Sequence, residues 1–286
     1  MLNAHGGQPS ALLITVNYKG ERSTLELLAS LNRLNGSSSL DVLVVDNGSG
    51  EENLLQLRAA IADWPNVQLL VSASNRGYFG AAKFAYERYL SQGRELPNWT
   101  IVCNHDVVID DPDFLLKLSS ENWQSTGVLA PRIRLAETGV EQNPFMLRPP
   151  GRWRRFTMRF YSSCYPLGVL WDWLSRQKRS LRKAFVSDVR PPEATQQIYA
   201  AHGSFLIFSR NYFLSGGMFD DSLFLFGEEI SVAETCRRLG LKILYAPGLQ
   251  VLHDEHSSVG PGMSRAAYRH HRQSVRHLFS KYLQGY

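Results

Sequence analysis

The most constraining feature of this sequence is the alternation of short apolar runs with longer amphipathic stretches through its first half. Ala11 to Val16, Asp41 to Asp46 and Trp99 to Cys103 are short and almost continuously apolar, as expected of strands buried on both faces. Between them, apolar residues recur at helical spacing, as the leucines between residues 27 and 34 do. Strands that alternate with helices in this way form a mostly parallel sheet with helices on both faces. We therefore expect an α/β fold.

Local signals predict where several helices begin. Ser23 with Glu26, and Ser49 with Glu52, have the spacing of a capping box, in which the two side chains satisfy free backbone N–H groups. Pro112 stands where the first residue of a further helix is expected, a position that tolerates proline.

Size and charge restrict the class of protein. A chain of 286 residues with 44% hydrophobic and 20% charged residues is an ordinary globular protein of one large or two small domains. The net charge of +5 suits phosphate-bearing molecules, anionic lipid or nucleic acid. No run approaches the roughly 18 apolar residues of a spanning helix, and the three cysteines lack metal-type spacing. We expect a cytoplasmic protein that can also lie peripherally on the inner face of the cytoplasmic membrane.

Polar residues follow four consecutive predicted strands. They are Asn17 and Tyr18, Asp46 and Asn47, Asn75 and Gly77, and Asn104 to Asp106. Ligands bind at the carboxyl ends of the strands in such sheets. Each residue alone would more often serve a turn, but four such tips on one edge favour a site for one polar ligand. No GxGxxG follows the first strand and no GxxxxGK[ST] occurs, which disfavours a dinucleotide fold or a P-loop enzyme.

A second notable stretch runs from Tyr199 to His253. An aromatic, strand-like run at Phe224 to Phe226 and a single glycine precede the acidic pair Glu228–Glu229, which opens a predicted helix. Two acidic residues at a helix start can simply complement the helix dipole. They can also supply a carboxylate that faces a cleft, and both interpretations are open from the pair alone.

Several of these segments together resemble one known family. The segments are VNYKG, VVDNGS, NRGYFGAA, CNHDVVI and GGMFDDSLFLFGEE, followed by the histidine at position 253. In this order they are similar to the family 2 glycosyltransferases, which have the GT-A fold and invert the anomeric carbon, and especially to the bacterial rhamnosyltransferase-like branch. The resemblance covers roughly Leu12 to His256.

The resemblance implies a donor and metal site at the strand tips. Asp46 would hold the base or ribose of the donor nucleotide. The other implied donor-site residues are Asn17, Tyr18, Asn47, Asn75, Gly77, Asn104 and Asp106. Asp106 occupies the last position of the family's DxD-type motif and would bind Mg²⁺ or Mn²⁺, whereas the first position is Asn104. His105 could be a second ligand or a spacer, and His253 could complete the metal site, touch the diphosphate or be structural.

The resemblance also implies an acceptor site around the acidic pair. Glu229 would be the general base that removes the acceptor proton, with Glu228 contacting acceptor hydroxyls. The implied acceptor-binding residues are His202, Gly203, Phe224 and Glu228. The family's usual Glu-Asp is Glu228–Glu229 here, and its later Asp-Leu is Ser231–Val232, so the reach of the base differs from the family pattern.

The resemblance and the composition together divide the chain. Residues 1–142 would be the nucleotide-sugar-binding α/β half, and residues 199–263 the acceptor and catalytic half of the same GT-A domain. Between them, residues 143–198 form a basic and aromatic insertion, either an acceptor-side lid or a membrane-surface segment. Residues 264–286 would be a C-terminal basic helix.

These expectations combine into one functional hypothesis with alternatives. The chain would be an inverting, metal-dependent hexosyltransferase that moves a sugar, with dTDP-L-rhamnose favoured, to a hydroxyl of a glycan or polyprenyl-diphosphate-linked saccharide in cell-surface polysaccharide synthesis. A UDP-sugar-dependent enzyme of the same fold and a non-catalytic nucleotide-sugar-binding protein are the alternatives. A nucleotidyltransferase is disfavoured because its chemistry needs no base aimed at a sugar hydroxyl. Nucleic acid is not an expected partner.

Overall fold

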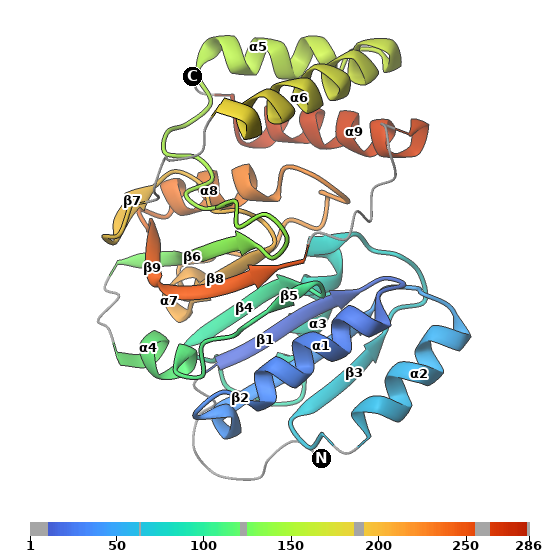
Figure 1. Cartoon of the computed structure of the whole chain (residues 1–286), viewed down its shortest axis with the longest axis vertical. Helices are drawn as coiled ribbons and strands as arrows, with labels where there is room; N and C mark the ends of the chain where they lie inside the picture. Colours follow the sequence, from blue (N-terminus) through green and yellow to red (C-terminus); the bar gives the residue numbers. More distant parts are fainter. Residues whose placement is uncertain (1–10, 63, 121–124, 186–191, 255–263, 285–286) are drawn as a thin grey trace.

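The computed structural model describes residues 11–62, 64–120, 125–185, 192–254 and 264–284. Parts of the predicted segments therefore lie outside the described residues, including residues 1–10, 186–191 and 255–263. In the described chain, nine strands form one sheet with the order β3-β2-β1-β4-β8-β6-β9-β5, and β7 pairs with β9 (Figure 1). Strands from residues 1–142 and from 199–263 belong to this one sheet. The proposed division of the chain stays a prediction.

The first half of the sheet is parallel, as the alternating pattern predicts. It comprises β1 (Ala11–Asn17), β2 (Leu40–Asp46), β3 (Val67–Val71) and β4 (Trp99–Asn104). Every residue of β1 and β2 is buried. Alternate side chains explain this: Leu12 and Ile14 pack with α3 (Tyr78–Ser91), whereas Leu13 packs with α1 (Glu21–Asn32) on the other face. The α/β fold class is confirmed.

The second half of the sheet is mixed. β8 (Phe205–Ser209) runs antiparallel to β4 and to β6 (Thr126–Leu135), and β6 pairs in parallel with β9 (Lys242–His253). The short strands β7 (Gln196–Ile198) and β5 (Val107–Val108) both run antiparallel to β9. In the β5–β9 register Val107 lies opposite His253, so the sheet itself carries His253 to the side of Asp106.

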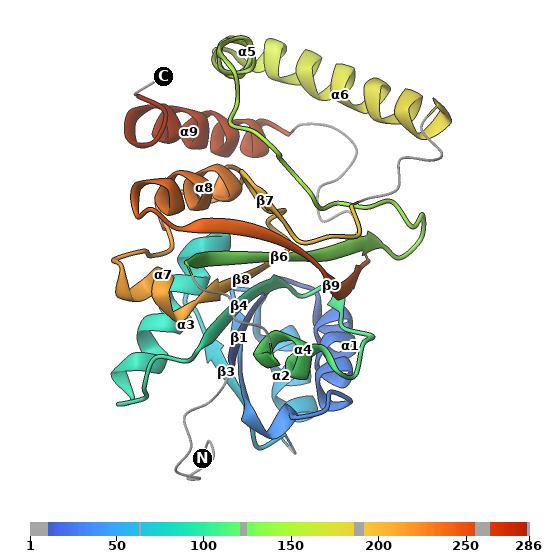
Figure 2. The ribbon, with the colours of Figure 1, turned by 90° about the vertical axis from the view of Figure 1, so that its left-hand side faces the viewer.

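The remaining helices build layers on one side of the sheet. α8 (Glu228–Arg238) lies on the sheet, α9 (Arg265–Lys281) lies on α8, and α5 (Arg152–Tyr161) and α6 (Tyr165–Phe185) lie beyond α9 (Figure 2). The other helical elements are α2 (Glu51–Ile61), α4 (Phe114–Ser120), α7 (Arg210–Leu214) and a 3₁₀ turn at Ser37–Ser39. Among the described helices, none combines the length and apolar character that crossing a bilayer requires.

Asp220 fixes α9 to the rest of the protein. Its Oδ2 accepts hydrogen bonds from His277 Nε2 at 2.7 Å, Lys281 Nζ at 3.0 Å and the Tyr282 hydroxyl at 2.6 Å. Burial alone would raise the pKa of Asp220, but these three hydrogen bonds hold it well below its usual range. The charged carboxylate therefore remains available to bind α9 at any physiological pH.

The predicted helix starts differ from those observed. α1 begins at Glu21 and α2 at Glu51, each after a glycine and without a side-chain cap, so neither capping box forms. Ser49 Oγ instead accepts the backbone N–H of Lys19 at 2.8 Å, because the two loops after β1 and β2 lie side by side. α4 begins at Phe114, two residues beyond Pro112. Tertiary contacts between loops, which local spacing does not report, decide these boundaries.

The Phe224–Phe226 run is a bend and not a strand. Phe226 and Gly227 both have positive φ values, 71° and 97°, which turn the chain sharply into α8. The Phe224 ring stacks on His270 of α9 at a centroid distance of 4.1 Å, and the Ser274 hydroxyl donates to the Leu225 carbonyl at 2.8 Å. The aromatic run thus serves contact with α9.

Gly77 packs against the other side of this bend. Gly77 has φ 74° and ψ −177°, and a Cβ there would lie 2.3 Å from the Phe224 carbonyl oxygen. The backbone N–H of Tyr78 donates to the same oxygen at 3.3 Å. Only glycine allows the loop after β3 to approach the bend before α8 this closely.

We expect Gly77→Ala to destabilise the protein by roughly 2–5 kcal/mol, because backbone strain and overlap with Phe224 add. Gly139→Ala is the matched control, since Gly139 also has positive φ (65°) but has open space around its Cβ position. Thermal unfolding of both variants separates the two causes. Equal losses for the two variants would show that the contact with Phe224 contributes nothing.

Candidate active site

The polar side chains after β1 and β2 form one buried hydrogen-bond network. Asn17 Nδ2 donates to Asp46 Oδ1 at 3.1 Å and to Ser49 Oγ at 3.2 Å. Asn17 Oδ1 accepts from Thr24 Oγ1 at 3.0 Å and from the Gly20 N–H at 3.2 Å. Asn17 and Asp46 are both buried, so in this structure their polar atoms hold together the loops after β1 and β2.

A second network continues along the same edge to the loop after β3. Asn47 Nδ2 donates to Asn75 Oδ1 at 3.0 Å, and Asn75 Oδ1 also accepts the Gly77 N–H at 2.9 Å. Asn47 is buried, whereas Asn75 is exposed, as is Tyr18 after β1. The predicted donor-site residues of the first three strand tips therefore lie on one edge, with Tyr18 and Asn75 as the members that solvent can reach.

At the fourth tip, Asp106 and His253 lie against each other. Asp106 Oδ1 is 3.2 Å from His253 Nε2, and both side chains are largely buried. His253 Nδ1 is 2.7 Å from Gln142 Oε1. With an amide oxygen facing it, Nδ1 carries the ring proton, which leaves the Nε2 lone pair directed at the carboxylate. Two electron-rich atoms at this distance need a shared cation, either a proton or a metal ion.

This pair suits a divalent metal that also binds a ligand. Within the described part of the chain, no group of three or more His, Cys, Asp or Glu side chains could enclose a metal. Mg²⁺ and Mn²⁺ in phosphate-binding sites take few protein ligands and complete their coordination with phosphate oxygens and water. Asp106 and His253 are thus the residues that could hold such an ion.

The flanking residues of the fourth tip have other contacts. His105 Nδ1 is 3.2 Å from the Val16 carbonyl, and the ring covers Gly20 so closely that a Cβ there would lie 2.0 Å from Nε2. Asn104 is partly exposed, and its backbone N–H donates to the Ser204 carbonyl at 2.9 Å. His105 is thereby engaged with the loop after β1.

The acidic pair lies at the start of α8 in a desolvated setting. Glu228 is buried, and burial, followed by the neighbouring charge of Glu229, raises its pKa to about 8. Burial also raises the pKa of Glu229, although backbone N–H groups, including those of Gly203 and Gly227, partly offset it. Glu229 is the more accessible of the two and has the anion-binding N–H groups. A carboxylate whose pKa is raised is a stronger base than an ordinary carboxylate, which suits general-base catalysis.

Gly203 joins the acidic pair to the donor side. Its carbonyl accepts the Tyr78 hydroxyl at 2.9 Å, while its N–H faces the Glu229 carboxylate. A Cβ on Gly203 would lie 3.0 Å from Glu229 Oε1, so glycine permits this approach. The pKa of Tyr78 is raised by burial and, to a lesser degree, by nearby acidic groups that include Glu228 and Asp106. Tyr78 therefore stays protonated, and its hydroxyl donates a hydrogen bond to Gly203.

His202 lies between the Asp106–His253 pair and the Glu228–Glu229 pair. Its ring centroid is 6.1 Å from that of His253, and its backbone N–H donates to Asn143 Oδ1 at 2.9 Å. Burial, and then the neighbouring His253, lowers the pKa of His202 to about 4, so it is neutral at physiological pH. Its Nδ1 then pairs with the Ser204 hydroxyl at 2.9 Å. His202 and Gly203 thus link the metal pair to the acidic pair.

Sequence reasoning missed three residues of this arrangement. They are Tyr78, Gln142 and Asn143, which contact Gly203, His253 and His202 respectively. Tyr78 lies in the segment NRGYFGAA that carries part of the resemblance, but nothing local identifies the partners of these three residues, because each partner is more than 50 positions away. Phe224 was predicted to contact the acceptor, and the structure places its ring against His270 of α9.

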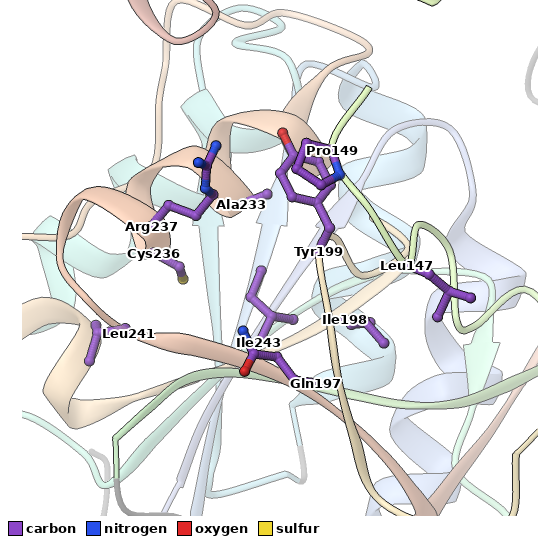
Figure 3. Close-up of a pocket in the computed structure, with 10 residues that line it drawn as sticks. All are labelled: Leu147, Pro149, Gln197, Ile198, Tyr199, Ala233, Cys236, Arg237, Leu241 and Ile243. Atoms are coloured by element: carbon purple, nitrogen blue, oxygen red, sulfur yellow. The ribbon is translucent and has the colours of Figure 1, made fainter. Parts of the chain in front are cut away.

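A cavity of about 280 Å³ lies elsewhere, against the side of α8 (Figure 3). Most of its lining is apolar and includes Leu147, Ala233 and Ile243. The two larger polar side chains in the wall, Tyr199 and Arg237, both bind Glu234, at 2.7 Å and 3.0 Å. Neither carboxylate pair lines this cavity, so we assign it no catalytic role.

Comparison with known proteins finds relatives that match most of this chain. Two curated relatives from Mycobacterium tuberculosis, strains CDC 1551 and H37Rv, are N-acetylglucosaminyl-diphospho-decaprenol L-rhamnosyltransferases. Each is 27% identical over 273 residues, which cover 92% of this chain and 81% of the relative.

Solved structures agree on the fold. One is a mannosyltransferase from Pyrobaculum calidifontis in complex with GDP-Man and Mn²⁺, with a TM-score of 0.55 at 14% identity over 89% of this chain. Another is GalNAc-T7 with UDP, GalNAc and Mn²⁺, with a TM-score of 0.62 at 15% identity over 97% of this chain. The chain spans 59% and 49% of those two proteins.

Residues 10–165, more than half of the chain, match the family described as Glycosyl transferase family 2. The match includes all four strand tips and Asp106. The expected class of enzyme and the GT-A-like fold are thus confirmed: this protein is a family 2 glycosyltransferase that uses a nucleotide-activated sugar.

Proposed function

We propose that this enzyme transfers a sugar, with inversion, from dTDP-L-rhamnose to a hydroxyl group of a polyprenyl-diphosphate-linked saccharide in cell-surface polysaccharide synthesis. The observation that carries the proposal is the link between two acidic sites through His202 and Gly203. The His202 ring centroid lies 6.1 Å from that of His253, the neighbour of Asp106, and Gly203 lies against Glu229. The site at Asp106 suits the diphosphate of a donor, and the site at Glu229 suits activation of an acceptor. The named activity of the mycobacterial relatives supports the choice of sugar and of a lipid-linked acceptor.

Glu229 would act as the general base. Its carboxylate takes the proton of the acceptor hydroxyl while the acceptor oxygen forms a bond to the anomeric carbon. The bond from that carbon to the diphosphate breaks on the opposite face, and the nucleoside diphosphate leaves. The raised pKa of Glu229 makes it a stronger base than an ordinary carboxylate, and the Gly203 N–H keeps it oriented.

Asp106 and His253 would hold Mg²⁺ or Mn²⁺ at the donor diphosphate. The chemistry that such an ion supplies is compensation of the negative charge on the leaving group. Gln142 fixes the tautomer of His253 so that Nε2 is free to bind, and such supporting contacts commonly tune metal sites. Mn²⁺ in both solved relatives supports this assignment.

A UDP-sugar is the second candidate donor. The loops after β1, β2 and β3 present Tyr18 and Asn75 to solvent, and neither side chain by itself distinguishes thymine from uracil. Product release from dTDP- and UDP-sugars, offered with a short-chain lipid-diphosphate acceptor, decides between the two donors.

Replacing the two glutamates separately identifies the base. Glu229→Gln should lower kcat by about a hundredfold or more, because the acceptor proton loses its recipient. Glu228→Gln should keep at least about a tenth of the activity at pH 7, because a side chain with a pKa of about 8 is already mostly neutral there. Equal turnover by Glu229→Gln and wild type would show that Glu229 is not the base. Absence of turnover in both proteins, with donor binding intact, would instead favour a protein that binds a nucleotide sugar without turning it over.

The Glu228→Gln variant also has an expected pH signature in stability. The folded pKa of Glu228 lies above its unfolded value, so wild-type stability falls as pH rises from about 4.5 to about 8. Glu228→Gln removes this dependence, and its midpoint of thermal unfolding should exceed that of wild type by a few degrees at pH 8 but not at pH 4.5. A constant difference across this range would contradict the raised pKa.

Metal dependence of donor binding tests the other pair. In a thermal-shift measurement with dTDP or UDP, addition of Mn²⁺ should increase the shift of the wild-type protein, and chelation should reverse it. Asp106→Asn and His253→Ala should lose the Mn²⁺-dependent part. Asp110→Asn, an exposed carboxylate four residues further on, is the matched control. Full Mn²⁺ dependence in the Asp106 variant would place the metal elsewhere.

A further inference from the structure

The outermost layer of the protein presents apolar side chains to solvent. On α5, Trp153, Phe156 and Phe160 are 76%, 56% and 46% exposed. Their spacing puts them on one face of the helix. The opposite face of α5 is engaged, since Met158 packs into the cluster below and Arg159 lies 4.1 Å above the Phe279 ring of α9. One face of α5 thus fixes the helix to the protein, and the other has no partner within the described chain.

Aromatic rings form a continuous row across both helices, and all of them except the partly buried Tyr161 are exposed. We call this row the aromatic ridge: Trp153, Phe156, Phe160, Tyr161 and Trp171. Consecutive ring centroids along it are 5.5, 6.0, 5.2 and 4.7 Å apart. α6 extends it with exposed aliphatic and aromatic side chains at Val169, Leu170, Trp173 and Leu174. An apolar surface of this extent on a globular protein marks an interaction site.

The charge of this layer is opposite to that of the rest of the protein. By sequence, α5 and α6 contain nine Lys and Arg residues and one Asp, a net +8. α9 adds five Lys and Arg and no acidic residue, which makes the three helices +13. Because the whole chain carries only +5, the remainder carries −8. The outer layer is therefore strongly basic as well as apolar, and the body beneath it is acidic.

We propose that the aromatic ridge docks into the headgroup region of an anionic lipid bilayer, so that α5 and α6 lie on the membrane as an interfacial anchor. Tryptophan and other aromatic side chains favour the membrane interface, and basic residues are attracted to anionic lipid headgroups. A helix that is apolar on one side and basic around it lies in the plane of the interface.

Charge and side-chain type disfavour two other occupants. A second copy of this face would bring two surfaces of net +8 together, and like charges oppose such pairing. A single-stranded nucleic acid would stack its bases on aromatic rings, but Val169, Leu170 and Leu174 offer no ring for stacking. A lipid phase accommodates aromatic and aliphatic side chains alike.

Membrane docking deepens the proposed function, on which its biological meaning rests. A polyprenyl-diphosphate-linked saccharide presents its hydroxyl groups close to the bilayer surface. α8, whose first residues are Glu228 and Glu229, lies beneath α9 on the side of the sheet that carries the ridge (Figure 2). Docking through α5 and α6 would therefore orient the acceptor-side half of the protein toward the membrane.

Vesicle binding tests the inference without any sugar present. We expect the full-length protein to co-sediment with phosphatidylcholine vesicles that contain 30% phosphatidylglycerol, at least tenfold more tightly than with pure phosphatidylcholine. Replacement of Trp153, Phe156 and Phe160 by serine together should weaken binding to the anionic vesicles at least tenfold. Leu55→Ser with Leu116→Ser is the matched control, because these residues are 57% and 53% exposed on α2 and α4, and it should change binding less than twofold.

Every other outcome counts against the inference. Binding of the ridge variant at wild-type strength would overturn it, as would equal binding of wild type to neutral and anionic vesicles. It would also fall if light scattering showed a wild-type dimer that the ridge variant loses, or if single-stranded RNA bound where vesicles did not.

Turnover with a water-soluble short-chain acceptor separates this inference from the proposed function. The ridge variant should keep at least half of wild-type turnover there, which also shows that it is folded. If the wild-type protein turned over the soluble acceptor but did not bind vesicles, only the docking surface would be refuted. Vesicle binding by a wild type without turnover would refute only the proposed chemistry.

Discussion

The backbone of Gly203 makes the contacts on which the candidate site depends. Its carbonyl accepts a hydrogen bond from Tyr78, at the start of the helix that follows the donor-side loops, and its N–H faces Glu229, at the start of α8. The backbone of one residue therefore fixes the distance between the half of the sheet that would bind the nucleotide and the carboxylate that would activate the acceptor. A preorganised distance of this kind is how enzymes gain rate without further chemical groups.

The layers outside the sheet support the same contact. The bend before α8 lies between Gly77 and α9. Gly77 can approach the bend because it has no side chain, and on the other side His270 of α9 stacks on Phe224. α9 in turn is held by Asp220, whose depressed pKa keeps it charged. The outer helices thus contribute to the position of Glu229 as well as to the surface of the protein. α9 therefore supports the candidate site through the bend before α8.

Much of the fold could be predicted because short apolar runs and helical leucine repeats are local signals. The parallel strands β1 to β4 and the polar residues at their tips follow from them. Helix boundaries could not, since Ser49 is drawn to the neighbouring loop and not to its own helix. The charged members of the candidate site, Asp106, His253, Glu228 and Glu229, could be singled out from the sequence because they lie in the segments that resemble the family. Tyr78, Gln142 and Asn143 act across long sequence separations, and a single sequence does not show which residues such side chains meet.

The kinetics of Gly203→Ala test the central claim most directly. A methyl group there would press on Glu229 Oε1, whereas Gly248→Ala, at a glycine with open space around it, serves as the control. The account predicts a fall in kcat of roughly a hundredfold for Gly203→Ala, with donor affinity and the thermal midpoint close to those of wild type and of the control. Unchanged kcat in a folded Gly203→Ala protein would show that the backbone of Gly203 does not hold Glu229, and would contradict the account.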